Sequence, residues 1–340
     1  MAAGKVLAGQ GPEELKELMA EFGEPSYRAA QLIKWIYRPV AAIGEMSNLP
    51  IGLRERLVQE TVYHPCSRVT VRRSQDGTRK YLLELQDGEL IESVYIPEAD
   101  RSTVCISSQV GCKMGCTFCA TGSMGFVRHL TAGEIVDQVL QVILDVGSRP
   151  SNVVYMGMGE PLENYGPLLR SIEILNAAWG LNIGIRQITV STCGLVPGIR
   201  RLGKEGLGLT LAVSLHAADD EKRSRIMPVA RVYSLDELLD ALHEYAARTK
   251  RRITIEYALM AGFNDSREDA RQLTELLRGL LCHVNLIPVN PIPGGLHHKP
   301  RDNQIVRFEN WLRRGGLEVK ERGADIEAAC GQLRGRWEEI

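Results

Sequence analysis

Residues 152–161 read NVVYMGMGEP, and this stretch decides the fold because it joins a short apolar strand to a glycine-rich, polar segment. The valines and the tyrosine between Asn152 and Met156 are typical of a buried strand. Gly157, Gly159 and Pro161 interrupt it, since glycine and proline favour a turn over a continued strand. The stretch therefore predicts a strand whose carboxyl end carries a loop that can bind a ligand.

The same succession of strand and helix is repeated after about Arg101. The candidate strands are Thr103–Ser107, Asn152–Met156, Gln187–Ser191, Leu209–Ser214, Ile253–Ala258, Val284–Val289 and Leu317–Lys320. Segments between them have helical periodicity, and these are Ala132–Val146, Leu168–Ala178, Leu235–Ala247 and Glu268–Leu280. Such alternation predicts an α/β fold with a parallel sheet of six or seven repeats.

Polar clusters follow several of these strands, which favours a barrel over a doubly wound sheet. They are Gly157–Pro161, Ser191-Thr192, Ser214-Leu215-His216 and Asn290-Pro291. The strands of a barrel share one mouth at their carboxyl ends, whereas a doubly wound sheet binds its ligand at one switch point. No Gly-x-Gly-x-x-Gly motif opens a helix. We therefore expect a partial (β/α) barrel of about six repeats over residues 101–340.

Two smaller parts are expected before the barrel. Residues 1–62 read as a helical accessory domain, because Pro12–Phe22 and Ser26–Tyr37 carry apolar residues at helical spacing until Pro39 and Pro50 interrupt the pattern. Residues 63–100 read as a β-hairpin extension. Its sequence alternates between polar and apolar residues, with turn signals at Asp76-Gly77 and Asp87-Gly88.

The composition is that of a soluble enzyme, with 340 residues, 44% hydrophobic and 24% charged. Residues 1–10 hold one lysine and no continuous apolar run, so no signal peptide is expected. No apolar stretch approaches the ~20 residues that span a bilayer. We therefore expect a cytoplasmic protein without a membrane partner.

The formal net charge is -1, which argues against a generally basic nucleic-acid binder, but the charge is unevenly spread. Residues 25–80 hold ten basic and four acidic side chains, a local excess of +6. The basic residues are Arg28, Lys34, Arg38, Arg54, Arg56, Arg68, Arg72, Arg73, Arg79 and Lys80. Such a patch can neutralise phosphates, or it can be a solvated face with no partner.

Three of the eight cysteines form a tight cluster, Cys112, Cys116 and Cys119, with the spacing Cys-x3-Cys-x2-Cys. Three thiolates this close on a loop can bind three irons of a [4Fe–4S] cube and leave the fourth iron open for a small molecule. A structural zinc site instead needs four ligands, and the sequence holds no second Cys-x2-Cys pair, although a distant histidine could complete one. The spacing favours the iron–sulfur cluster.

The segment from Cys105 to Gly122, CISSQVGCKMGCTFCATG, resembles the signature of the RlmN family of radical S-adenosylmethionine (SAM) methyltransferases. The resemblance covers nearly the whole chain, with the motifs in the family's order. Besides the polar strand ends it includes Ser26-Tyr-Arg-Ala-Ala-Gln31 and Asp325-Ile-Glu-Ala-Ala-Cys-Gly331. It implies methylation of the 2-position of an adenine in 23S ribosomal RNA and in tRNA, at or equivalent to adenosines 2503 and 37.

The resemblance also implies a role for each matching residue. The [4Fe–4S] cluster would be held by Cys112, Cys116 and Cys119. The residues that would contact SAM are Gly159, Glu160, Ser191, Ser214, Leu215, His216 and Asn290. Cys66, Cys193 and Cys282 match no family role and are interpreted as structural, and the loop with His297 and His298 as a flexible mouth segment.

The chemistry explains why further cysteines are needed, because the 2-carbon of adenine is electrophilic and cannot attack the methyl group of SAM. In the family, a first SAM methylates a cysteine that corresponds to Cys330. A second SAM is split to a deoxyadenosyl radical, which takes hydrogen from that methyl group, and the carbon radical then adds to the ring. Cys105 corresponds to the thiol that releases the product as a disulfide, and Glu92 to the base that accepts the ring proton. Cys105 could also be a fourth cluster ligand or core filler.

The expected partners follow from this chemistry. They are 23S rRNA and tRNA, an electron donor and a disulfide reductant, with the chain itself a monomer. The helical module with Arg28, Lys34 and Arg38 would contact RNA phosphates. Three alternatives stay open: a Cfr-like enzyme that methylates the 8-position, a zinc-stabilised RNA-binding protein without catalysis, and a radical SAM enzyme with a different product that has no need of Cys330.

Overall fold

The structure is a computed structural model, and it describes residues 5–290 and 294–321. The chain divides into two compact units, each built from three segments. The first consists of Met1–Val110, His129–Val153 and Asn164–Ile188, and the second of Gly111–Arg128, Val154–Glu163 and Thr189–Ile340. In the described residues, no helix is both long and apolar enough to span a membrane.

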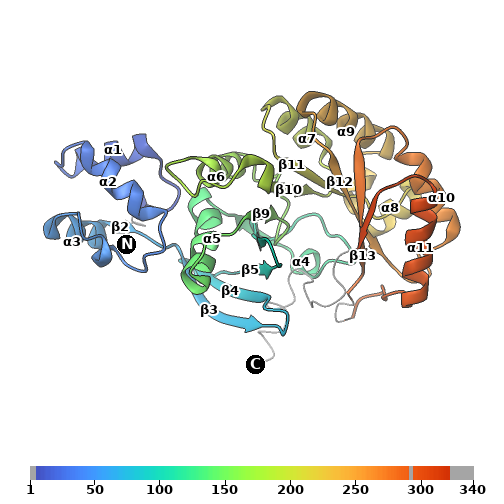
Figure 1. The fold of residues 1–340 in the computed structure, drawn as a ribbon, viewed down its shortest axis with the longest axis horizontal. Coiled ribbons are helices and arrows are strands. Elements are labelled where there is room, and N and C mark those ends of the chain that lie inside the picture. The colour runs from blue at the N-terminus through green and yellow to red at the C-terminus, as the bar shows by residue number, and fades with distance from the viewer. Residues whose placement is uncertain (1–4, 291–293, 322–340) are drawn as a thin grey trace. The chain divides into compact units, whose positions relative to one another are not determined.

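The first unit begins with a small helical module (Figure 1). Its elements are β1 (Lys5–Val6), α1 (Pro12–Glu21), α2 (Tyr27–Ile36), η1 (Ile43–Glu45), α3 (Ile51–Glu60) and β2 (Thr61–Val62). Leu15, Leu32 and Leu57 are fully buried within it, one from each α-helix. The sequence pattern does not predict the helix α3, because Pro50 interrupts the helical spacing of apolar residues. In the structure Pro50 is the N-cap of α3, a position where the missing N–H of proline costs nothing.

Four antiparallel strands follow in the first unit, and they confirm the predicted hairpins. They are β3 (Cys66–Arg73), β4 (Arg79–Leu85), β5 (Leu90–Pro97) and β6 (Ser102–Cys105), paired in that order. Gly77 and Gly88 adopt φ angles of 84° and 83° in the two turns, which suits glycine. The remaining elements of this unit are the helices α5 (Ala132–Val146) and α6 (Tyr165–Asn176) and the short helix η2 (Ile185–Gln187). The hydroxyl of Tyr81 on β4 donates to Asp145 of α5 at 2.9 Å.

The second unit is built on parallel strands with helices between them. The strands are β10 (Ile188–Thr192), β11 (Thr210–Ser214), β12 (Ile253–Leu259), β13 (Cys282–Pro288) and β14 (Val319–Glu321). Each pairs in parallel with the next, so their order in the sheet is their order in the chain. Every residue of β12 is buried, as expected for a parallel strand covered on both faces.

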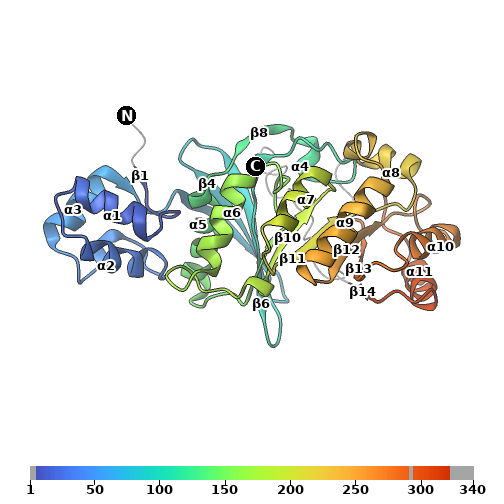
Figure 2. The same cartoon turned by 90° about the horizontal axis from the view of Figure 1, so that it is seen from above.

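The helices of the second unit lie along one side of these strands (Figures 1 and 2). They are α7 (Val196–Lys204), α8 (Asp220–Ile226), η3 (Pro228–Arg231), α9 (Leu235–Thr249), α10 (Arg267–Leu276) and α11 (Asp302–Arg314). A doubly wound sheet would reverse its strand order at a switch point. The continuous order and the helices on one side instead agree with the predicted partial barrel, and the α/β class is confirmed.

Three short strands and one short helix lie in the part of the sequence where the chain passes from one unit to the other and back. They are β7 (Gln109–Gly111), α4 (Ala120–Ser123), β8 (Phe126–His129) and β9 (Asn152–Tyr155). The strand β9 ends one residue earlier than predicted, and β7, β8 and α4 had not been foreseen. The loop with the three clustered cysteines, residues 112–119, lies between β7 and α4.

Candidate active site

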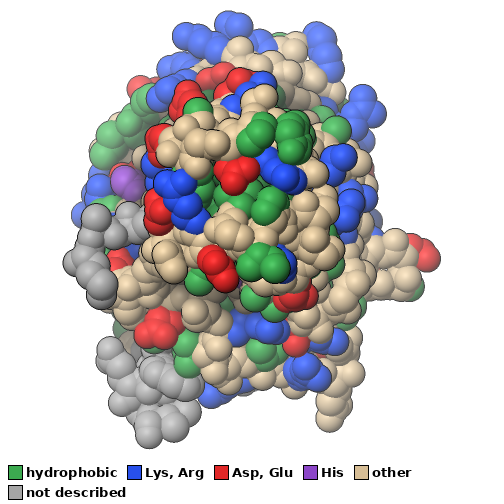
Figure 3. Space-filling model, turned by 90° about the vertical axis from the view of Figure 1, so that its left-hand side faces the viewer, with side chains coloured by type: hydrophobic (Ala, Val, Ile, Leu, Met, Phe, Trp, Pro, Cys, Tyr) green, Lys and Arg blue, Asp and Glu red, His purple; other side chains and the backbone are tan. Residues whose placement is uncertain are grey.

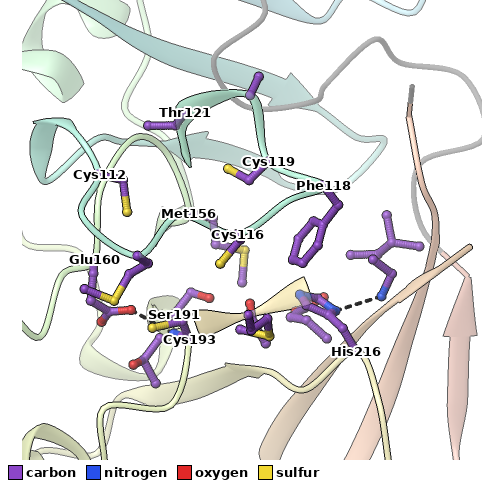
Figure 4. Close-up of a pocket in the computed structure, with 18 of the residues that line it drawn as sticks. Cys112, Cys116, Phe118, Cys119, Thr121, Met156, Glu160, Ser191, Cys193 and His216 are labelled. Carbon is purple, nitrogen blue, oxygen red and sulfur yellow. Dashed lines mark hydrogen bonds between the residues drawn. The ribbon is translucent and has the colours of Figure 1, made fainter. Parts of the chain in front are cut away.

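The second unit contains a cavity of about 340 Å³ at the carboxyl ends of its parallel strands (Figure 4). Its wall combines the cysteine loop, the segment after β9 and the ends of β10, β11, β12 and β13. The predicted site residues that line it are Cys112, Cys116, Cys119, Gly159, Glu160, Ser191, Ser214, His216 and Asn290. Residues far apart in the sequence are thus brought to one mouth, as a barrel predicts.

The cysteine loop is held in shape by its own backbone hydrogen bonds. The N–H of Cys119 donates to the carbonyl of Cys116 at 3.2 Å, and the N–H of Gly122 donates to the carbonyl of Cys119 at 3.0 Å. The N–H of Thr117 donates to the carbonyl of Ile226 at the end of α8, at 3.0 Å. The loop is therefore anchored both to itself and to the helix that follows β11.

A glycine before the first clustered cysteine allows a close approach of two backbones. Gly111 has a φ of 75°, and a Cβ atom there would lie 2.0 Å from the carbonyl oxygen of Gly125. The next residue, Cys112, donates its N–H to that same oxygen at 2.7 Å. Any side chain at position 111 would therefore push the first cysteine away from its bonded position.

The electrostatics of the loop suit a bound cation. Burial, together with the neighbouring Cys119 and Glu160, raises the pKa of the Cys112 thiol to about 12. Burial also raises the pKa of Cys116. Thiolates at these positions need a compensating positive charge. A bound iron supplies that charge, and coordination to it deprotonates the thiol. Three thiols on the wall of one cavity are a donor set that fits a [4Fe–4S] cube with one open iron.

No three Cys, His, Asp or Glu side chains within residues 5–290 and 294–321 are placed to bind a single metal ion. This does not conflict with the proposed cluster. The cysteines of a cube bind different irons, so they lie farther apart than the ligands of one ion.

Glu160 is buried at the cavity wall and its carboxylate is fixed by two backbone groups. The N–H of Cys193 donates to Oε2 at 2.7 Å (Figure 4). The N–H of Leu162 donates to Oε1 at 3.0 Å. Burial raises the pKa of Glu160, and these hydrogen bonds offset part of that effect. A carboxylate on the cavity wall can form a charge-assisted hydrogen bond with an ammonium group of a bound molecule.

His216 is buried at the end of β11 and its ring is held on two sides. The N–H of Ala258 donates to Nδ1 at 2.9 Å, and the ring meets Phe118 edge-on with 4.6 Å between centroids. Burial, together with the positive charge of Arg223, lowers the pKa of His216 to about 3. The imidazole is therefore neutral, and because Nδ1 accepts a hydrogen bond, Nε2 carries the proton.

Arg223, a residue that the sequence did not single out, is fully buried beside the site. Its Nη2 donates to the carbonyl of Cys193 at 2.7 Å, and its Nε donates to the carbonyl of Leu215 at 3.2 Å. The guanidinium thus ties the loop after β10 to the end of β11. Nothing in the local sequence DEKRSRI distinguishes this arginine from the surface residues around it.

Several other residues on the cavity wall were not predicted either. They are Met114, Phe118, Tyr155, Met156, Thr192, Cys193, Met227, Glu256 and Ala258 among others. Glu256 had a signal, because a glutamate stands inside the otherwise apolar strand ITIEYAL. Cys193 was interpreted as structural, and it is buried, but it also lines the cavity.

Leu215 does not line the cavity. Its side chain is fully buried, and its N–H donates to the carbonyl of Glu256 at 3.0 Å. Its backbone thus connects β11 to β12, and its carbonyl receives the hydrogen bond from Arg223.

Glu92 and Cys105 belong to the first unit, where the strand register brings them to one face of the antiparallel sheet. Leu82 of β4 is opposite Glu92 of β5, and Val94 of β5 is opposite Cys105 of β6. Residues two apart on a strand share a face, so Glu92 and Cys105 are diagonal neighbours. Cys330 lies outside the described residues.

The structure changes the interpretation of the basic patch. Six of its ten cations lie within 4 Å of carboxylates, namely Arg28, Arg56, Arg68, Arg73, Arg79 and Lys80. Arg28 also donates to Gln31 at 2.7 Å, with a side chain only 19% exposed. Figure 3, which views the chain from the side of α1–α3 in Figure 1, shows basic side chains interspersed with acidic ones. Lys34 and Arg38 remain exposed, and they line a hollow of about 440 Å³ together with Trp179.

Two models of known protein families match this chain, one over the helical module and one over the region with the clustered cysteines. The family model "Ribosomal RNA large subunit methyltransferase N-terminal domain" matches residues 7–62, and the model "Radical SAM superfamily" matches residues 106–274. The second match contains the three clustered cysteines and β9 to β12.

Relatives named "Probable dual-specificity RNA methyltransferase RlmN" are similar over almost the whole chain. The one from Symbiobacterium thermophilum is 48% identical over 338 residues, which is 97% of this chain and 91% of the relative. The one from Clostridium perfringens strain SM101 is 50% identical over 328 residues, which is 95% of this chain and 94% of the relative.

A solved structure gives the same answer for the fold. The crystal structure of a radical SAM methyltransferase from Sphaerobacter thermophilus superposes with a TM-score of 0.93 at 46% identity, covering 96% of this chain and 98% of that one. The predicted fold class and family are confirmed. The chain belongs to the RlmN family of radical SAM RNA methyltransferases.

Proposed function

We propose that this protein methylates the 2-position of an adenine in 23S rRNA and in tRNA. The observation that carries the proposal is the joining of three loop cysteines and five polar strand ends around one cavity, in a chain of the RlmN family. Cys112, Cys116 and Cys119 would hold the cluster. When bound, the cluster supplies the electron that splits SAM into methionine and a deoxyadenosyl radical.

The cavity residues would hold SAM. Its amino group would be placed against the Glu160 carboxylate, which is already fixed by two backbone N–H groups. The neutral His216, with a proton on Nε2, can donate one hydrogen bond to an acceptor on the cofactor. The apolar side chains of Phe118, Met156 and Ala258 exclude water from the same wall, which protects a radical from side reactions.

Three further residues would carry out the transfer to RNA. Cys330 takes a methyl group from one SAM, loses a hydrogen atom from that methyl to the deoxyadenosyl radical of a second SAM, and forms a C–C bond to the ring. The adduct would give up its ring proton to Glu92 and one electron to a one-electron acceptor. The cluster can fill that role, because splitting SAM leaves it oxidised. The Cys105 thiolate then attacks the sulfur of Cys330. The C–S bond breaks, the released carbon takes a proton, and the disulfide that forms must be reduced by a cellular thiol.

The shared face of Glu92 and Cys105 supports this assignment, because both groups must act on the same adduct. Because the steps follow one another, substituting one residue should stop the reaction at the step that this residue carries out. Cys105→Ala should leave the protein covalently attached to RNA, because the adduct forms but no thiol releases it.

The RNA-binding surface is proposed to include Lys34 and Arg38. Both lie on or directly after α2, and they share the hollow with Trp179, whose indole can stack on an unpaired base. A target base must leave its stack to reach an enclosed site, so single-stranded or loop RNA is the expected substrate form.

The test of the function is nucleoside analysis of RNA after incubation with anaerobically reconstituted protein and SAM. Chromatography with mass spectrometry separates 2-methyladenosine from 8-methyladenosine, and we expect the 2-methyl product from both an rRNA fragment and tRNA. Cys330→Ala should abolish it, whereas Cys282→Ala, at the opposite end of β13 from the cavity, should leave it unchanged. Formation of 8-methyladenosine would contradict the assigned position, and methylation by Cys330→Ala would contradict the pathway.

A further inference from the structure

Lys80 forms an ion pair with Glu92 inside the first unit. Its Nζ lies 3.2 Å from Oε2 of Glu92, and the two side chains are only 12% and 3% exposed. A carboxylate this deeply buried is costly to keep charged unless a cation lies beside it. The base proposed for the ring proton therefore has a charged partner within the described residues.

The ion pair is a consequence of strand register. Lys80 of β4 is opposite Val94 of β5, and Leu82 is opposite Glu92, so Lys80 and Glu92 are diagonal neighbours on one face. Val94 is in turn opposite Cys105 of β6. Lys80, Glu92 and Cys105 thus lie on three adjacent strands of the same face.

The opposite face of these strands has a different role. Tyr81 and Arg79 both bond to Asp145 on α5, at 2.9 and 2.6 Å. The bonds to α5 therefore come from Arg79 and Tyr81 and not from Lys80. If the position of Lys80 needed only to fill space, a long aliphatic side chain would suffice there.

We propose that Lys80 is a positioning residue for the ring-proton transfer, which holds the Glu92 carboxylate ionised and oriented. This inference rests on the proposed role of Glu92 as proton acceptor. In the transfer, the ring C–H bond breaks, an O–H bond forms on Glu92, and the ammonium of Lys80 keeps its three protons throughout. Lys80 acts on the carboxylate and does not itself touch RNA or cofactor in this scheme.

The other charged or titratable side chains on this face must be considered in any pH experiment. By register they are Arg72 of β3, which is opposite Lys80, Glu84 of β4 and Cys105 of β6. Arg72 and Glu84 are exposed, whereas Glu92 is buried. Removal of Arg72 therefore serves as a matched loss of a cation from the same face.

The experiment compares Lys80→Met, Lys80→Arg, Arg72→Met and Glu92→Gln. For each, the rate of adenine methylation is measured from pH 6 to 9, beside deoxyadenosine formation from SAM, iron content and circular dichroism. We expect Lys80→Met to slow methylation about tenfold at neutral pH and to move the acid limb of the rate profile about one unit upward, because a carboxylate without its cation is protonated more easily. Deoxyadenosine formation should be unchanged, Lys80→Arg should restore the wild-type profile, and Arg72→Met should match the wild type.

The outcomes separate the two proposals. If Lys80→Met has the wild-type pH profile while Glu92→Gln is inactive, or if Lys80→Arg is as defective as Lys80→Met, the role of Lys80 is wrong and the proposed function stands. If Glu92→Gln methylates at the wild-type rate, the assignment of the base is wrong. Should Lys80→Met fail to fold, Lys80→Gln removes the charge but keeps a hydrogen-bond donor, and the same profile shift is expected.

Discussion

Single residues around the cysteine loop determine whether three thiols can face one cavity. Gly111 is needed both for its left-handed φ and for the close approach of the Gly125 carbonyl. The spacing of the cysteines is visible in the sequence, but this backbone contact is not. The loop geometry thus depends on two glycines that flank the motif as well as on the motif.

A pair of substitutions can separate the two demands on glycine in this loop. Gly111→Ala should destabilise the protein by about 2–4 kcal/mol, because the new Cβ meets a backbone carbonyl that cannot move freely. Gly125→Ala has a similar φ of 72° with nothing within 4 Å of its Cβ, so it should cost only about 1–2 kcal/mol. Denaturant unfolding measures both values. Equal costs would mean that backbone conformation alone, and not the close contact, requires Gly111.

At the scale of elements, His64 connects the helical module to α5 within the first unit. Its Nδ1 lies 2.5 Å from Oδ1 of Asp137, and its Nε2 lies 3.2 Å from the carbonyl of Val40. Both ring nitrogens face acceptors, so the doubly protonated ring can donate a hydrogen bond to each of them. Burial alone would lower the pKa of His64, but the hydrogen bond and charge of Asp137 outweigh it and raise the pKa.

The raised pKa gives a pH dependence with a defined sign. The folded protein holds the proton more tightly than the unfolded chain, so the pair stabilises fully below the unfolded pKa of about 6.5 and loses this effect as the pH rises through the folded pKa. The difference in unfolding free energy between wild type and His64→Gln should therefore be larger at pH 6 than at pH 9. Thermal or urea unfolding at both values checks this. A difference that grew with pH would show that His64 is neutral in the fold.

The surface of α2 allows a test of RNA contact by charge reversal. Lys34→Glu with Arg38→Glu should weaken RNA binding by about tenfold or more, and it should reduce the salt dependence of binding, because two phosphate contacts are lost. Arg28 is left intact, since its bonds to Gln31 and Glu24 give it a structural role.

The control makes the same change in net charge elsewhere. Lys204→Glu with Arg267→Glu alters two exposed cations of the second unit, on α7 and α10. Filter binding or fluorescence anisotropy compares the double variants. Equal weakening by both would show that RNA senses only the overall charge.

For the whole molecule, the sequence patterns predicted the positions of strands and helices, because these depend on the periodicity of apolar residues along the chain. The predicted strands Asn152–Met156 and Ile253–Ala258 differ from β9 and β12 by one residue at one end, and Ala132–Val146 coincides with α5. Apolar runs and helical stripes reflect burial, which is a local property of each segment. The polar clusters after the strands were visible in the same pattern, whereas the SAM contacts expected of their residues came from the resemblance to the family.

Properties that depend on distant partners could not be predicted in this way. The basic excess over residues 25–80 was counted from the sequence, but Asp145, outside that range, lies within 4 Å of three of its arginines. Arg223 and Cys193 acquire their places only when β10, β11 and α8 come together. The ion pair of Lys80 with Glu92 likewise needs the register of β4 and β5, which no single segment determines.

The most direct test of the central claim follows the hydrogen atoms of the transferred methyl group. Oxygen-free, iron-loaded protein is given SAM with a fully deuterated methyl group and an RNA fragment, and the methylated adenosine is analysed by mass spectrometry. Passage through a methylene on Cys330 predicts a product methyl that keeps two deuterium atoms and gains one hydrogen from solvent. A product that keeps all three deuterium atoms would show direct methyl transfer from SAM and would contradict the account.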